Sequence, residues 1–316
     1  MLLRLGIWLC VFVILPIGFT AYSWGFKAHQ LITQMAMFSL PTEMLTFYKS
    51  HWVELRQASI QPDIRRYVWD DEKPRHYIDL DLYSATQQDS LKKGWNVAII
   101  FIGEDTLMAN GILPFSLETT VYELTQAFRE KNERSIIRYS GDLAHYVGDA
   151  HVPLHTTANY NGQLTGQRGI HALWESRIPE LESDEYSFWL ASADYIPNVR
   201  SEVWDIIYSS HAKVDSVISI EKLLSADFME DRKYTFRESG KSTIKTYSQN
   251  YVTSYSKRLM GMVENQMKES AQLTANLWFT CWVNAGQPDL EDLIYGDADN
   301  KMDSVNTHDS RSILHH

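Results

Sequence analysis

Two pairs of histidine and carboxylate residues stand four positions apart, a spacing that suits the ligands of one metal ion. His145 and Asp149 occur in the segment GDLAHYVGDAHVPLH, and His171 and Glu175 occur in GIHALWE. On a helix, residues four apart project from the same face one turn from each other, so each pair can reach one cation. His155 follows a proline between the two pairs, where an unwinding helix can turn the imidazole toward either pair.

The density of these residues is what indicates a metal site. A single His-x-x-x-Asp pair is weak evidence, because such pairs often form surface hydrogen bonds. Two pairs and His155 within about thirty residues are an arrangement that 11 histidines placed at random would seldom produce. Imidazole nitrogen and carboxylate oxygen together suit zinc, and manganese or iron can use the same ligand types.

Two further candidates come from an irregular stretch upstream. Asp63 occurs in QPDIRRY, and His76 occurs in KPRHYIDLD. Taken singly, each is typical of a residue that forms hydrogen bonds within a loop. His151 follows Asp149 by two positions and points away from the ligand face, so we interpret it as a packing or supporting histidine.

The elements that must position these residues are predicted to be helices. Alternating strand patterns are scarce, and the segments 59–83 and 156–169 have the composition of irregular structure. We therefore expect an all-α protein with a single multi-helix domain. Apolar residues recur three and four apart in the ranges 29–40, 96–107, 119–128, 136–147 and 243–284, the last as one or two helices.

The two ends of the chain differ from its middle. Residues 1–23 contain one basic residue, an apolar run and a small-residue end, which is typical of a signal peptide. The apolar run is short and its end is interrupted by Pro16 and Gly18, which favours cleavage over a membrane-spanning helix. Residues 24–286 would then form the helical domain, and the polar residues 287–316 would form a disordered tail.

Composition limits the function classes further. The net charge of −11 weighs against large polyanionic partners, unless bound cations reverse the charge locally. Cleavage would remove Cys10 and leave Cys281 alone, so the mature chain could form no internal disulfide. The sequence indicates no protein partner and no permanent membrane span in the mature chain. We expect a periplasmic or secreted protein.

The order and spacing of nine residues resemble the zinc-dependent phospholipases C and the related single-strand-specific zinc nucleases. Glu175 is closer to the phospholipase branch, since the nucleases usually have aspartate there. The resemblance implies the same all-helical fold. The matching positions are Trp24, His29, Asp63, His76, His145, Asp149, His155, His171 and Glu175.

The resemblance also implies a cofactor content of three zinc ions. Trp24 would become the first residue of the mature chain and would bind zinc through its free amine and its carbonyl oxygen. The implied ligands are Asp63, His76, His145 and Asp149 for one ion, His155, His171 and Glu175 for a second, and Trp24, His29 and the bridging Asp149 for a third.

What the resemblance implies about activity is hydrolysis of a phosphodiester by a hydroxide that zinc generates from water. Asp63 would act as a ligand or as the base that orients the water. A phospholipid head group is the favoured substrate, although Lys27 and Ile64 depart from the choline-binding residues of the best-known phospholipases. The alternatives are a nuclease or nucleotidase that acts on single-stranded nucleic acid, and a non-catalytic zinc-stabilised binding protein.

Overall fold

The computed structural model describes residues 25–239 and 242–294. The predicted signal peptide, Trp24 and residues 295–316 of the predicted tail lie outside the described residues. The α-helices are α1 (Phe26–Phe38), α2 (Thr42–Ser50), α3 (Trp52–Ala58), α4 (Gln61–Arg65), α5 (Ala85–Leu91), α6 (Trp95–Ile102), α7 (Glu104–Asn110), α8 (Leu113–Arg129), α9 (Glu133–Ala150), α10 (Ile170–Ala172), α11 (Ile178–Glu182), α12 (Val199–His211), α13 (Val214–Asp227), α14 (Glu230–Lys233), α15 (Gln249–Arg258) and α16 (Met262–Asn284).

Short turns and one hairpin complete the described part. Strands β1 (Tyr234–Ser239) and β2 (Ser242–Tyr247) pair antiparallel, with Tyr234 opposite Tyr247. The short turns are η1 (Asp70–His76), η2 (Leu80–Leu82), η3 (Pro153–Thr156), η4 (Leu173–Arg177) and η5 (Ser183–Glu185).

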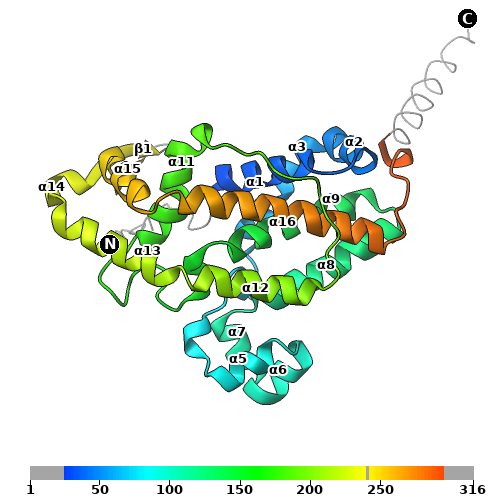
Figure 1. Cartoon of the computed structure of the whole chain (residues 1–316), viewed down its shortest axis with the longest axis horizontal. Helices are drawn as coiled ribbons and strands as arrows, with labels where there is room; N and C mark the ends of the chain where they lie inside the picture. Colours follow the sequence, from blue (N-terminus) through cyan, green and yellow to red (C-terminus); the bar gives the residue numbers. More distant parts are fainter. Residues whose placement is uncertain (1–24, 240–241, 295–316) are drawn as a thin grey trace, which may run out of the picture.

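The long helices α9 and α16 form the centre of the molecule, with α1 and α8 packed against both of them (Figure 1). Large side chains of the main core fill the space between these helices. The Trp278 ring stacks on Tyr48 with a centroid separation of 4.8 Å, and its Nε1–H donates to the carbonyl of Ser140 at 3.1 Å. These contacts fix the position of α9, which carries two of the predicted ligands.

A second cluster of buried apolar residues lies at the other end of the molecule. Trp174, Tyr251 and Tyr255 are its largest fully buried side chains, and α1 contributes Ala28 and Ile32. Because α1 contributes to both cores, it is held along its whole length.

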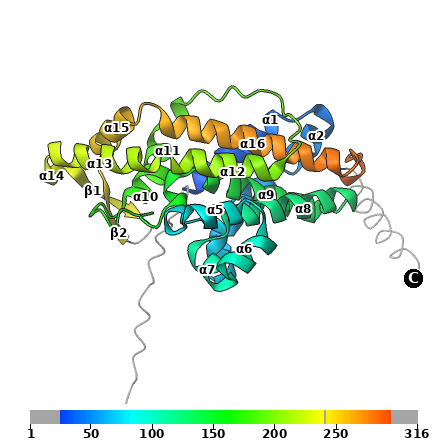
Figure 2. The ribbon, with the colours of Figure 1, turned by 60° about the horizontal axis from the view of Figure 1, so that its bottom comes forward.

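The helices α5 to α7 project from the body of the molecule, as two views show (Figures 1 and 2). The chain returns from this projection beside the segment that follows η1. The Tyr77 hydroxyl donates to the carbonyl of Ala109 at 3.1 Å, and the Asp79 N–H donates to the carbonyl of Asn110 at 2.7 Å. The projection therefore supports the segment 77–79.

An extended segment, residues 186–197, follows the outer side of α16. Its backbone N–H groups donate to side chains of that helix: Ser187 to Glu264 at 3.1 Å, Ala191 to Gln272 at 2.8 Å and Ile196 to Thr280 at 2.9 Å. Side chains of α16 thus take the place of a neighbouring strand for this segment.

The expectation of an all-α, single multi-helix domain is confirmed. Two local predictions were wrong. The range 243–284 begins with strand β2, because Thr243, Ile244 and Thr246 have branched side chains that favour extended backbone. The helix expected over 96–107 is broken into α6 and α7 by Gly103, which has a φ of 91°.

The start of the predicted tail also needs correction. Residues 287–294 belong to the fold: Leu290 is 2% exposed in the main core, and the Trp282 Nε1–H donates to the carbonyl of Pro288 at 2.9 Å. A few apolar residues in a polar stretch are enough to anchor it. Among the described residues, no α-helix combines the length and the apolar character that a membrane span requires.

Candidate metal centre

Helix α9 supplies the central pair of the site, His145 and Asp149. Its first turn is capped by Asn132, whose side chain accepts the Ser135 N–H at 3.0 Å. The helix ends at Ala150, shortly before Pro153, which cannot continue it. His145 and Asp149 are both fully buried on the same face, as their spacing predicts.

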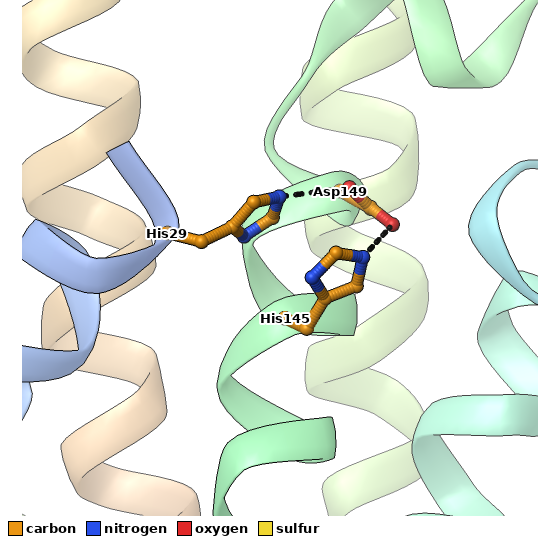
Figure 3. Close-up of side chains that lie close together, drawn as sticks. All are labelled: His29, His145 and Asp149. Atoms are coloured by element: carbon orange, nitrogen blue, oxygen red, sulfur yellow. Dashed lines mark ion pairs between the residues drawn. The ribbon is translucent and has the colours of Figure 1, made fainter. Parts of the chain in front are cut away.

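Helix α1 adds His29 to this pair to form the first group. His29 Nε2 lies 3.7 Å from Asp149 Oδ1, and His145 Nε2 lies 3.3 Å from Asp149 Oδ2 (Figure 3). The rings of His29 and His145 stack with a centroid separation of 3.9 Å. One ligand atom from each of the three residues falls within 4.8 Å of the others, so the group can hold one metal ion.

Asp63 of α4 and His76 of η1 form the second group together with His145. His145 Nε2 lies 3.9 Å from Asp63 Oδ1 and 3.1 Å from His76 Nδ1. His76 Nδ1 is also 2.9 Å from Asp149 Oδ2. The first and second groups are therefore adjacent and share His145. Asp149 belongs to the first group and also contacts His76 of the second.

The third group consists of His155, His171 and Glu175. His155 Nε2 and His171 Nε2 each lie 3.1 Å from Glu175 Oε2. Glu175 is on η4, a widened π turn that continues α10. Such turns occur often at functional sites. His155 Nδ1 lies 3.8 Å from Asp149 Oδ1, which links this group to the other two.

Backbone carbonyl groups orient three of the imidazoles. The Nδ1–H of His145 donates to Ser59 at 2.9 Å, that of His155 to His76 at 2.5 Å, and that of His171 to Tyr160 at 3.0 Å. Each bond fixes the tautomer and leaves Nε2 directed at the site. Metal-binding histidines are typically held in this way.

The electrostatics favour ionised carboxylates beside the imidazoles. Burial opposes ionisation of Asp149, but His145 and His155 outweigh it and hold its pKa well below the ordinary value. At His29, burial disfavours the protonated ring and lowers the pKa well below its ordinary value. At His155 burial acts in the same direction, yet Asp149 and Glu175 outweigh it and raise the pKa to about 9. The carboxylates thus attract positive charge, which a metal ion or a proton can supply.

Unsatisfied oxygen atoms test whether a cation fits. Within the described part of the chain, no hydrogen bond is formed to Oδ2 of Asp63, Oδ1 of Asp149 or Oε1 of Glu175, and these three atoms are buried; Oδ1 of Asp63 likewise accepts no hydrogen bond, although the Arg66 guanidinium lies 3.3 Å from it. A buried carboxylate oxygen without a donor is costly. Because each group contains one of these atoms, a cation in each group would remove that cost, and the donor set fits zinc.

A pocket of about 610 Å³ opens onto the site, and His76, His155 and His171 are among the residues that line it. Two cationic residues, Arg66 and Lys73, and the aromatic Tyr77 and Tyr160 contribute to its walls, as does Asp79. Arg66 also reaches the site itself, since its Nη1 lies 3.3 Å from Asp63 Oδ1.

The structure brings together all eight predicted side-chain ligands that it describes. These are His29, Asp63, His76, His145, Asp149, His155, His171 and Glu175. Trp24 lies outside the described residues. His151 belongs to none of the three groups, and its Nδ1–H donates to the carbonyl of Val147 at 2.7 Å, in keeping with the interpretation as a packing residue.

Sequence reasoning did not name the pocket residues Arg66, Lys73 and Tyr160 as candidates. The signal for Arg66 was its position one helical turn after Asp63. Neither the comparison with protein-family models nor the comparison with curated proteins finds a match to this chain. The geometry of the site therefore carries the functional conclusion.

Proposed function

We propose that this protein is an exported zinc-dependent phosphodiesterase of the phospholipase C type. The observation that carries the proposal is the convergence of three adjacent buried His/Asp/Glu groups, two of which contribute lining residues to one open pocket. A site that only stabilised the fold would need no access from solvent. The resemblance of the ligand order to zinc-dependent phospholipases C and zinc nucleases supports the same conclusion.

The sharing of His145 supports a role for Trp24. One imidazole nitrogen binds one ion, so if His145 joins Asp63 and His76, the first group keeps only His29 and Asp149. A third donor is then needed from another part of the chain. Gly25 packs beside Ser176, the residue after Glu175, since a Cβ on Gly25 would lie 3.5 Å from the Ser176 Cβ. Trp24 precedes Gly25 in the sequence, and we propose that its free amine supplies the third donor.

The chain's own residues provide the remaining functions. Each group offers few protein ligands, which leaves coordination positions for water and substrate. Bound zinc would supply Lewis acidity toward water and toward a phosphate oxygen. Arg66 offers a bidentate donor for a phosphate group at the pocket wall, and Asp63 would serve as a ligand or as a base.

The pocket walls favour a second candidate, a single-strand-specific nuclease or nucleotidase. Tyr77 and Tyr160 present aromatic rings on which a nucleobase can stack. Asp79 adds a carboxyl group that can bond to the edge of a base. The overall negative charge opposes long polyanions, so a short single strand or a nucleotide would suit this pocket best.

One experiment tests the metal centre and the substrate together. The chain that begins at Trp24 is purified, its zinc is counted, and hydrolysis is measured on a phospholipid panel and on single-stranded DNA. We expect about three zinc ions per chain and turnover of one substrate class. Asp149→Asn should lose most of the zinc and nearly all turnover, because Asp149 borders all three groups.

Each result separates the candidates. Hydrolysis of phospholipid supports the phospholipase reading, and hydrolysis of DNA supports the nuclease reading. Three bound zinc ions without either activity would favour the non-catalytic zinc-stabilised protein. Full zinc content and full activity in Asp149→Asn would contradict the proposed centre. Export itself is tested by recovering the chain outside the cytoplasm with Trp24 as its first residue.

A further inference from the structure

His76 differs from the other histidines of the site in how its ring is held. Its Nδ1 faces Asp149 and His145, so its Nε2 is the nitrogen that points away from them. Within the described part of the chain, this buried Nε2 has no hydrogen-bond partner. The group that faces it is a carboxylate: Glu72 Oε1 lies 3.7 Å away.

Glu72 is itself held in place by several contacts. It is 4% exposed, and it lies four residues before His76 in the turn η1. The Arg65 guanidinium donates to both its oxygens, at 3.2 Å from Nε to Oε2 and 3.3 Å from Nη2 to Oε1. The Tyr146 hydroxyl donates a short hydrogen bond to Oε1, the same oxygen that faces His76.

The arrangement contains more than an ion pair requires. Arg65 also donates to Asp142 at 2.9 Å, so the guanidinium already has a buried carboxylate partner in α9. Burial of a second carboxylate beside the same guanidinium costs desolvation free energy, which suggests that this carboxylate also interacts with another group. The second metal group contains two imidazoles. The Nδ1–H of His145 donates to the carbonyl of Ser59, whereas no carbonyl holds Nε2 of His76, and Glu72 turns one oxygen toward that nitrogen.

We propose that Glu72 is the positioning residue of His76. Its carboxylate, 3.7 Å from Nε2, attracts the Nε2–H of the neutral ring electrostatically, keeps Nδ1 directed at the cation of the Asp63, His76 and His145 group, and makes that nitrogen more basic. Arg65 and Tyr146 keep Glu72 ionised and aimed. The inference rests on the metal-binding part of the proposed function and is independent of the substrate.

The test measures metal binding directly. Metal-free wild type and Glu72→Gln are titrated with Zn²⁺ against a competing chelator, and with Co²⁺ while the visible absorption reports the coordination. We expect one binding step of Glu72→Gln to weaken by about 10- to 100-fold with an altered cobalt spectrum, while the other steps keep their affinity.

Asp142→Asn is the matched control. It removes a buried carboxylate that shares Arg65 with Glu72 and makes no ion pair with His76 among the described contacts. We expect its metal-binding steps to equal those of wild type. An equal loss in Asp142→Asn would show that the effect passes through Arg65 and packing, and it would overturn the inference, as would unchanged binding by Glu72→Gln.

Two further outcomes keep the result interpretable. Should Glu72→Gln fail to fold, Glu72→Asp withdraws the carboxylate by one methylene and must weaken the same step, or the inference is wrong. Wild type that binds no metal would overturn both this inference and the proposed metal centre. Wild type with three zinc ions and an unchanged Glu72→Gln would overturn this inference alone.

Discussion

At the scale of single residues, the wall of the pocket carries a poorly solvated carboxyl group, Asp79. Burial raises its pKa to about 7, the neighbouring Asp81 adds to the effect, and His155 opposes it. Tyr77 and Tyr83 also face this carboxyl group. Asp79 is therefore expected to change charge near neutral pH, in the pocket that opens onto the candidate metal centre.

Asp79 should make the stability of the fold depend on pH. Its folded pKa of about 7 exceeds the ordinary value of 3.8, so the folded state holds this proton more tightly. The stabilisation is complete below about pH 4 and is lost as the pH rises through 7. We expect Asp79→Asn to gain about 1 to 2 kcal/mol relative to wild type between pH 4 and pH 8, after discounting for partial exposure.

The measurement is urea unfolding of both proteins across this range. Asp231→Asn, which changes an exposed carboxylate on α14, serves as the control and should follow wild type at every pH. A constant difference between Asp79→Asn and wild type from pH 4 to pH 8 would contradict the prediction.

At the scale of elements, two glycines of α9 let other helices approach the site. A Cβ on Gly148 would lie 3.0 Å from Nδ1 of His29, and a Cβ on Gly141 would lie 2.4 Å from the Cβ of Ala58. Ala58 ends α3 and precedes Ser59, whose carbonyl orients His145. The missing side chains of Gly148 and Gly141 therefore allow His29 and the end of α3 to approach α9.

The same substitution at the two glycines should have different effects. Gly148→Ala pushes on a buried ring that stacks on His145, so we expect weaker metal binding in the His29 group and a small change in stability. Gly141→Ala meets backbone atoms of α3, so we expect a loss of about 1 to 3 kcal/mol in the free energy of unfolding. Zinc titration and urea unfolding of both variants check this, and equal effects at the two positions would contradict it.

Periodicity predicted the elements that carry the site better than it predicted the connections. The spacing of His145 and Asp149 placed both on one face of α9, because a long amphipathic helix shows its period clearly. The hairpin β1–β2 was missed because six-residue strands give a short signal. The segment 186–197 was missed because its partners are side chains of α16, which no local pattern reveals.

The site shows a similar division. Asp63 and His76 lie on short irregular elements, so their place in the site came from the resemblance and not from spacing. Glu72 and His76 have the same four-residue spacing as the recognised pairs, but Pro74 stands between them and disfavours an α-helix there. The contact between them depends on the turn η1, which the sequence alone does not specify.

At the scale of the whole molecule, the three groups connect segments that are distant in the chain. They join α1, α4, η1, α9, η3 and the α10–η4 segment. In the described part of the chain the only cysteine is Cys281, which is buried, so no disulfide provides such links there. Bound metal would therefore cross-link the fold as disulfides do in many extracellular proteins.

Removal of metal should destabilise the protein strongly and reversibly. Each site contributes about 4 kcal/mol when the free metal is a thousand times its Kd. We expect excess EDTA to lower the melting temperature by well over ten degrees, and added zinc to restore it. Calorimetry with EDTA already saturated by Ca²⁺ is the control for nonspecific effects of the chelator. An unchanged melting temperature in metal-free protein would contradict a structural contribution of the metals.

The widened turn Leu173–Arg177 also limits how this protein can diverge. Such a turn holds one residue more than the α-turn it replaces, and each helical residue advances the direction of a side chain by about 100°. Loss of a single codon between His171 and Glu175 would therefore rotate the Glu175 carboxylate by about 100° relative to His171. Point substitutions do not change the direction of the Glu175 side chain around the turn, so related chains should vary here in residue type while keeping the same length.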